Sequence, residues 1–428
     1  MDNMTSTFGT SSSAYVTESS PMPRSLPWVV ALLLGYPLLQ QYLRYRRLNA
    51  MKTKYNYFTR QDLAKMTDQE AWEIFNNLAE LEFPTIFEKG IQFALFRTYG
   101  IPTISSLLVK TTQMSTAKNA GKRYADTAVL LGEIFGNKPT SEHAIDSFGR
   151  MNYLHSFYRD SGQILDDDML YTLALFAVEP IKWVERYDWR KFSDLEKCAM
   201  GTFMKSMGDA MLIKYGNLPS AKRGFRDGIQ WLEEIGQWAE EYETKHMVPN
   251  EKNHQNANET TALLLITIPE ALKPMGRHAI SAMMDDRLRD AMMYPRPPPI
   301  YFRVLDVVLA LRKYFMKYIA LPRPSFMRYH LLDDKEDSKG RRGVQRYEAY
   351  PFYVRPTLWN RWGPASWPSR LLGLPLPGDC GDVYYPKGYL LPEVGPNTFV
   401  GKGSVAASET KARLAKERTG GCPFAVPR

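Results

Sequence analysis

Cysteine is scarce in this sequence. Only 3 of the 428 residues are cysteine, at positions 198, 380 and 422, and none of them belongs to a CxxC pair. An odd number of widely separated cysteines indicates neither a disulfide framework nor a cysteine-based zinc site. We therefore expect a protein of a reducing compartment.

Several catalytic sequence motifs are also missing. The chain contains no HExxH, Walker A, GxSxG or GxGxxG sequence, and Gly401-Lys-Gly403 is an isolated glycine pair near its end. Neither Cys380 nor Cys422 has the glycine and arginine neighbours of a cytochrome P450 haem thiolate. These absences exclude the enzyme classes whose mechanisms depend on those motifs.

Strand-like patterns are scarce as well. Alternation of polar and apolar residues is rare, and no succession of strand, helix and strand signals occurs. Apolar residues instead recur at three- and four-residue spacing, as in the stretches 62–96, 193–213, 224–243 and 304–321, which is the helical period. A hydrophobic content of 44% is typical of a folded globular chain. The sequence therefore predicts an all-α body.

The net charge of +9 is spread along the chain rather than gathered. Basic residues alternate with acidic ones, and no Lys/Arg run lies on an aromatic-studded sheet or reading helix. We expect no nucleic-acid partner. The anionic cytoplasmic face of a membrane suits this charge better.

A transmembrane signal anchor is predicted over residues 27–47. An apolar run up to Leu43 is followed by an arginine cluster, and Trp28 and Tyr42 would lie at the two membrane interfaces. A cleaved signal peptide would carry its positive charge before the apolar run. A buried soluble helix would not normally carry such a one-sided cluster.

The residues before the anchor indicate its orientation. Residues 1–26 are rich in Ser and Thr and predict a disordered tail. The positive-inside rule places this tail in the lumen and the body in the cytosol. Asn3, in the sequence Asn-Met-Thr, would then be a glycosylation acceptor, making the chain a glycoprotein.

The C-terminal part differs in composition from the helical body. We predict a helical domain over residues 55–330 and an extension over 331–428 packed on it. Eleven prolines between residues 321 and 400 predict an irregular segment. The last 28 residues hold six basic and two acidic side chains and are expected to be loosely ordered.

One of the six histidines lies in the sequence RMNYLHSFYRD, residues 150–160. With Ile145 at zero on a helical wheel, Phe148 falls at about 300°, His155 at about 280° and Arg159 at about 320°. The histidine and the arginine thus share the inward face. A buried arginine needs an anion, which is either a protein acid among Asp166–Asp168 or a ligand. In the first case His155 is a core histidine satisfied by a carbonyl.

A second candidate is the pair Lys110-Thr111 in the sequence IPTISSLLVKTTQMS. Thr111 lies on the apolar face of the predicted helix and Lys110 at its edge. The lysine either extends to water or, if buried, is held neutral and able to ligate a metal.

Acidic clusters offer a rival chemistry. Asp166–Asp168 and the set Asp285, Asp286 and Asp290 resemble the aspartate-rich motifs by which all-α prenyl-diphosphate enzymes hold magnesium. Leu170 replaces a needed aspartate in the first cluster, and arginines stand within the second. Asp166–Asp168 would otherwise cap the following helix.

Three stretches carry a resemblance to a known family: RMNYLHSFYRD, the following DDDMLYTLALFAVEPIKWVERYDW, and FRTYGIPTISSLLVKTTQ. Residues 60–330 resemble the oxygenases that unite bacterial rubber oxygenases with fungal membrane-bound oxygenases of the endoplasmic reticulum. The resemblance implies a globin-like, multi-helix domain with haem b and dioxygen as co-substrate. It also implies cleavage of a double bond in a farnesyl chain, with a lipophilic farnesylated phthalide as substrate. The pathway would make a meroterpenoid such as mycophenolic acid.

The resemblance also assigns roles to residues. His155 would be the proximal ligand of the haem iron, Lys110 and Thr111 would lie on the distal side, and Arg159 would hold a propionate. Glu82 and Glu88 are equal candidates for the general base.

The chain departs from the rubber oxygenases at four positions. Asp160 follows the arginine where they have a further histidine, Tyr171 and Leu173 replace Trp and His of many bacterial relatives, and Asn152 replaces a common arginine. The rival functions are a magnesium-dependent prenyl-diphosphate enzyme and a membrane-anchored scaffold that works through its proline-rich segment and basic tail.

Overall fold

The computed structural model describes residues 25–111 and 117–424, and within them the protein is all-α, as predicted. No strand forms in this part of the chain, and only two isolated bridges pair extended residues. The longer helices are α1 (Leu26–Tyr55), α3 (Asp68–Asn77), α4 (Pro84–Thr98), α5 (Pro102–Lys110), α6 (Ala117–Gly136), α7 (Glu142–Asp160), α8 (Asp166–Tyr187), α9 (Asp194–Ala210), α10 (Gly228–His246), α11 (Glu251–Leu264), α12 (Lys273–Met283), α14 (Pro299–Tyr318) and α17 (Ser404–Glu417). Short helices are α2 (Arg60–Leu63), α13 (Asp286–Ala291), α15 (Leu358–Trp362) and α16 (Trp367–Leu371).

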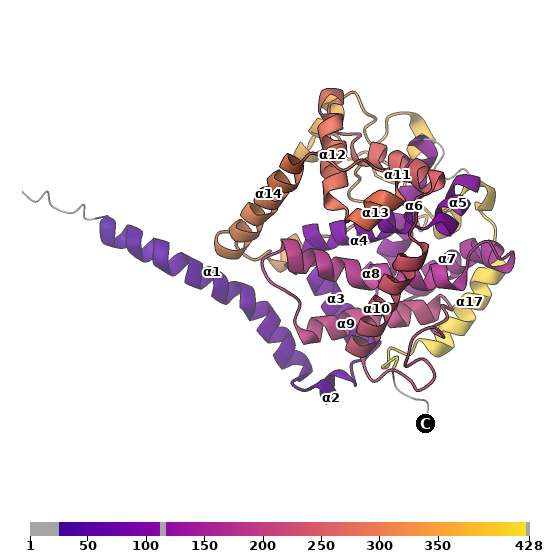
Figure 1. Ribbon diagram of the computed structural model, residues 1–428, viewed down its shortest axis with the longest axis horizontal. Coiled ribbons are helices and arrows are strands. Elements are labelled where there is room, and N and C mark those ends of the chain that lie inside the picture. Colours follow the sequence, from indigo (N-terminus) through magenta and orange to yellow (C-terminus); the bar gives the residue numbers. More distant parts are fainter. Residues whose placement is uncertain (1–24, 112–116, 425–428) are drawn as a thin grey trace, which may run out of the picture.

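The centre of the body is α8, which packs against α4, α9 and α10 (Figure 1). Its first turn consists of Asp166, Asp167 and Asp168, whose charges complement the positive end of the helix dipole. The cluster therefore lies at the helix start, but the predicted capping role was wrong, because the N-cap residue is Leu165 and no side chain caps the helix. Along the helix, α4 approaches closely at Gly90, where a Cβ atom would lie 2.7 Å from the Cα of Pro180.

The helix α1 contains the predicted membrane anchor, residues 27–47. No helix in the described residues combines the length and the apolar character needed to cross a bilayer, so the predicted span finds no support there. The C-terminal half of α1 packs on the body: Gln40 is fully buried, and its side-chain amide donates to the carbonyls of Met316 and Ala320. Arg44, from the predicted cytosolic flank, donates to the same Ala320 carbonyl at 2.7 Å. The polar end of the predicted anchor thus binds protein.

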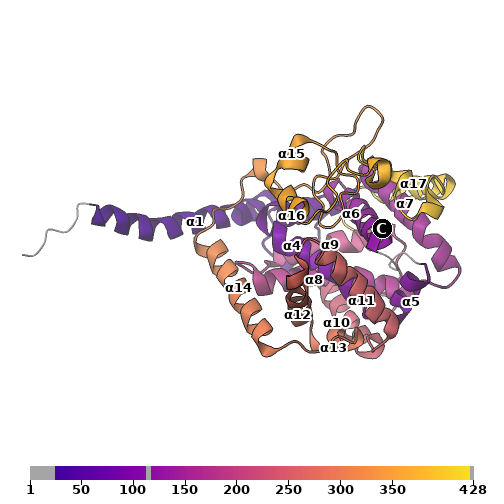
Figure 2. The same cartoon turned by 90° about the horizontal axis from the view of Figure 1, so that it is seen from above.

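The N-terminal half of α1 projects away from the body (Figures 1 and 2). Trp28 and Tyr42, the predicted interfacial residues, are 78% and 67% exposed. The predicted glycosylation acceptor Asn3 lies outside the described residues.

The C-terminal extension lies on α6 and α7. The hydroxyl of Tyr353 donates to Asp126 at 2.6 Å, and that of Tyr389 donates to Glu133 at 2.5 Å. At the end of the chain, residues 404–417 form the ordered helix α17, which packs along α7. The expectation of a loosely ordered tail was therefore wrong for this helix, since its Leu414 is fully buried in the main core.

Candidate functional site

The helix α7 carries the candidate histidine and begins at the N-cap Ser141, whose hydroxyl accepts from the amide of Ala144. Its predicted inward face is confirmed, because Phe148 is fully buried and Ile145 is 7% exposed. The same face meets the C-terminal end of α9, where the amide of Asn152 donates to the carbonyl of Ala210 at 3.0 Å.

The imidazole of His155 has an unsatisfied ring nitrogen. Its Nδ1 is buried and has no hydrogen-bond partner among the described residues. Burial lowers the pKa of His155 to about 4, with smaller contributions from the charges of Arg123 and Arg159. The ring is therefore neutral at physiological pH, which is the state that ligates a metal. The alternative was a core histidine bonded to a backbone carbonyl. At Nδ1 no such bond is found among the described residues.

Arg159 has the partners that a buried arginine needs. Its guanidinium donates to the carbonyls of Met211 and Leu212, both at 3.0 Å, and to Asp166 at 3.3 Å. The carbonyls belong to the end of α9, where a helix leaves its last acceptors unpaired. Protein groups thus supply the anionic and carbonyl partners of Arg159. This is the first of the two alternatives that the sequence allowed, a protein acid among Asp166–Asp168.

The predicted distal pair lies at the end of α5. Lys110 is exposed, and its ammonium donates to the side chain of Gln163 at 2.8 Å. Gln163 follows α7, and its backbone N–H donates to the carbonyl of Tyr158. The Thr111 hydroxyl donates to the Leu107 carbonyl in its own helix at 2.9 Å. The structure therefore brings Lys110 to the His155 end of α7, but the burial that would hold it neutral is not found.

Arg123 is a functional candidate that sequence reasoning missed. It lies on α6 and its charge acts on His155, yet among the described residues its guanidinium has no hydrogen-bond or ion-pair partner. The acid on which its charge acts, Asp126, already accepts from Lys122 and Tyr353, so the guanidinium can still bind an anionic group. Only the packing of α6 against α7 reveals it, because no sequence pattern joins positions 123 and 155.

The residues around His155 fit a haem in part. A neutral, buried histidine with an open ring nitrogen suits an iron ligand, and Arg123 suits a propionate. Arg159 is already bound to protein acceptors, so Arg123 replaces it as the better candidate for that role.

The two candidate bases lie in other networks. Glu82 accepts from Arg47 at 3.0 Å and from Arg190 at 3.4 Å, and both oxygens of Glu88 accept from the Tyr329 hydroxyl at 2.9 Å. Burial raises the pKa of both carboxyl groups. Neither glutamate is bonded to His155.

The magnesium alternative finds no support in the described residues. Asp285 is paired with Arg97, and Asp286 with Arg289. Asp290 is exposed. Within the described part of the chain, no group of three or more acidic, histidine or cysteine side chains could hold a metal ion.

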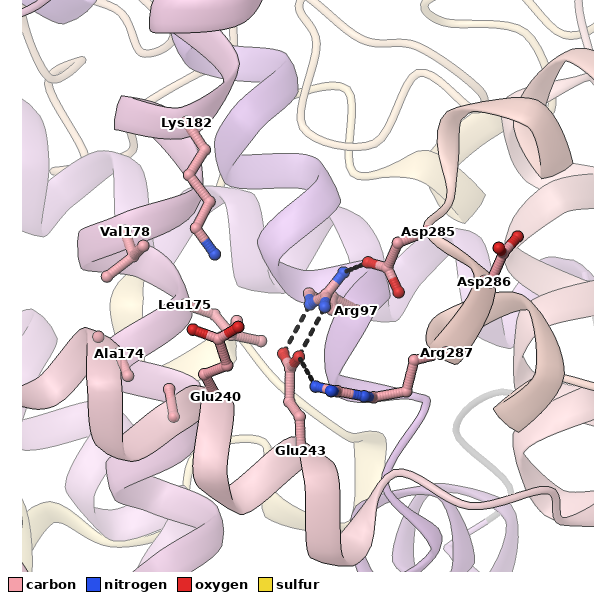
Figure 3. Close-up of a pocket in the computed structure, with 12 residues that line it drawn as sticks. Arg97, Ala174, Leu175, Val178, Lys182, Glu240, Glu243, Asp285, Asp286 and Arg287 are labelled. Carbon is pink, nitrogen blue, oxygen red and sulfur yellow. Dashed lines mark hydrogen bonds and ion pairs between the residues drawn. The ribbon is translucent and has the colours of Figure 1, made fainter. Parts of the chain in front are cut away.

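A cavity of about 420 Å³ opens between α8, α10 and the start of α13. Three apolar residues of α8 face it: Ala174, Leu175 and Val178. Figure 3 shows that charged side chains surround the rest, with Glu243 between Arg97 and Arg287. The lining of this cavity is therefore largely charged, unlike the apolar pocket that a farnesyl chain would need.

Two of the departures from the rubber oxygenases have structural roles. Tyr171 is fully buried, and its hydroxyl donates to Glu243 at 2.8 Å. Leu173 is 2% exposed and packs in the main core. Asp160 is exposed at the end of α7.

The low pKa of His155 predicts a pH dependence of stability. Between pH 6.5 and about 4 the unfolded chain binds a proton at this ring that the folded protein excludes, so stability falls as the pH falls through this window. We expect the wild type to lose about 3 kcal/mol more of its free energy of unfolding than His155→Gln over this range. Urea denaturation at several pH values measures this difference.

Comparison with known proteins shows extensive similarity to three fungal proteins. The chain is 51% identical over 399 residues to the ER-bound oxygenase mpaB' of Penicillium brevicompactum, which covers 93% of this chain and 94% of that protein. It is 47% identical over 363 residues to the ER-bound oxygenase mpaB of the same fungus, covering 85% of this chain and 86% of that protein. It is 53% identical over 296 residues to the ER-bound oxygenase mpaB of Penicillium roqueforti, covering 69% of this chain and 99% of that protein. No protein-family model matches the chain.

Proposed function

This chain belongs to the MpaB family of oxygenases, and on that premise we propose that it cleaves a double bond of a farnesyl chain with dioxygen at the membrane of the endoplasmic reticulum. The observation that carries the proposal is the neutral His155, whose Nδ1 is buried without a partner among the described residues. An ordinary core histidine would satisfy both ring nitrogens.

His155 and Arg123 would hold a haem b from the helices α7 and α6. The histidine offers a neutral ring nitrogen to iron, and the guanidinium of Arg123 offers a charge-assisted bond to a propionate. When bound, the haem would supply the iron that activates dioxygen. Arg159 is a positioning residue in this scheme, because it holds the end of α9 against α7 through two carbonyls.

The overall reaction balances without an external reductant. The alkene bond breaks, each of its carbons becomes a carbonyl carbon, and the two oxygen atoms of one dioxygen molecule end on the two fragments. A farnesylated phthalide partitions into lipid, so an enzyme at the membrane surface meets its substrate at high local concentration. We place the enzyme in the biosynthesis of a meroterpenoid such as mycophenolic acid.

Absorption spectroscopy and iron analysis of the purified protein test the proposal. We expect a Soret band in the wild type that His155→Ala abolishes, because the variant lacks the ligand. The matched control is His143→Ala, a histidine of the same helix whose side chain is 41% exposed; it should keep the band. Circular dichroism checks that both variants fold.

Lys110→Ala tests whether Lys110 would be a ligand of the haem iron or would lie outside its coordination sphere. A shifted resting spectrum with haem still bound would place Lys110 at the iron, and an unchanged spectrum would remove it from coordination. A colourless preparation that still cleaves the farnesyl chain would contradict the haem but leave the oxygenase proposal standing.

A further inference from the structure

The helix α14 exposes an apolar face to the outside of the protein. Eight side chains lie within about 120° of the helical wheel and are between 36% and 64% exposed. We call them the outer face of α14: Ile300, Val304, Val307, Val308, Leu311, Tyr314, Phe315 and Tyr318. No charged residue falls within this arc. An exposed apolar stripe about 30 Å long is not typical of a protein surface that faces only water.

The side of α14 that packs on the body carries both apolar and charged side chains, and its Leu309 and Met316 pack against the main core. Arg312 donates to the carbonyl of Tyr187 at 3.1 Å and to Asp188 at 3.3 Å. Lys313 donates to the carbonyls of Glu185 and Arg186, each at 3.3 Å. These carbonyls close α8, whose C-terminal end attracts cations.

The outer face continues toward the exposed side of α1. The C-terminal end of α14 is joined to α1 by hydrogen bonds from Gln40 to the carbonyl of Met316 and from Tyr36 to that of Ile319. Figures 1 and 2 show both helices on the same side of the body, with α1 projecting past the end of α14. The exposed side of this projecting part is also apolar and includes Trp28, Leu34, Leu38 and Tyr42, which are 67% to 78% exposed.

We propose that the outer face of α14 docks flat on a lipid bilayer, with the projecting part of α1 as its continuation. Charge supports a bilayer as the occupant. Arg303 and Lys317 border the stripe at its two ends, and Asp306 is the only acidic residue of α14. Basic residues beside an apolar helical face are typical of helices that lie in an anionic membrane surface. The inference rests on the proposed function and deepens its membrane association.

A fluorescent label at position 311 reports the contact directly. Leu311→Cys is placed in a Cys380→Ser, Cys422→Ser background and labelled with an environment-sensitive dye. Vesicles of phosphatidylcholine and phosphatidylserine that carry a lipid-attached quencher are then added. We expect a blue shift and several-fold quenching of this label. The control label at Val405→Cys, an exposed site on α17, should stay in water.

A charge-substituted variant measures the strength of the contact. Val304→Asp, Leu311→Asp and Phe315→Asp together should lower the vesicle partition coefficient of the full chain by roughly tenfold or more. Val248→Asp with Val405→Asp, two exposed valines elsewhere, should not. Circular dichroism should show both variants folded, and turnover of detergent-dissolved substrate should persist, so that a docking failure is distinct from a failure of the proposed function.

Three results would overturn the docking proposal. One is a position-311 label that stays water-exposed on vesicles. Another is an unchanged partition coefficient for the α14 variant. The third is a blue shift that needs no vesicles and accompanies a doubled mass in light scattering, which would make a second copy of the chain the occupant.

Discussion

Glu243→Ala is expected to lower the free energy of unfolding by about 4 kcal/mol. The carboxylate of Glu243 accepts two bonds of 2.6 Å from Arg97 and one of 2.8 Å from the Tyr171 hydroxyl. The side chains of Arg97 and Glu243 are 9% and 7% exposed. Removing the carboxylate leaves the buried guanidinium with only Asp285 as its acidic partner among the described residues. It also leaves the Tyr171 hydroxyl without its acceptor.

Urea denaturation of the wild type and the variant measures this loss. The matched control is Glu240→Ala, one turn away on the same helix, exposed and lining the same cavity; it should change stability by less than about 0.5 kcal/mol. The double variant Arg97→Met with Glu243→Leu should be more stable than Glu243→Ala, because it removes both charges together. Equal losses for Glu243→Ala and Glu240→Ala would refute the argument.

Leu414→Asp is expected to destabilise the protein by about 4 kcal/mol or more, because it places an unpaired carboxylate in the main core. Leu414 is fully buried on α17, which packs along the helix that carries His155. Near the middle of this contact, a Cβ atom at Gly149 would lie 3.1 Å from the carbonyl oxygen of Ala407. Loosening α17 should therefore also weaken the binding of any group held by α7.

Val405→Asp makes the same kind of change at a site of α17 that is 71% exposed, and it should be nearly neutral. Thermal melts and the Soret absorbance of both variants provide the comparison. If Leu414→Asp melts like Val405→Asp, α17 does not contribute to the core. A deletion of residues 401–428 would not separate an enzyme from a scaffold, since it would remove this packing from either.

Sequence reasoning succeeded where a feature is local. The apolar period of residues 62–96 and 224–243 predicted helices that the structure contains, and the wheel around Ile145 placed Phe148 on the buried face correctly. It could not decide the run 27–47, because the same apolar pattern suits a membrane span and a helix packed on protein. Arg44 distinguishes them only through its contact with the Ala320 carbonyl, 276 residues away in sequence.

The sequence by itself determined the helical class, the inward position of His155 and, through its similarity to known oxygenases, the family. Only the tertiary structure decided that Arg159 binds the end of α9, that the charge of Arg123 acts on His155, and that α14 turns an apolar face outward. The physical reason is that periodicity fixes which side of a helix is apolar, whereas the partner of each side chain comes from a distant segment. A helix such as α14, with apolar residues on two sides, leaves the choice of the buried side to its neighbours.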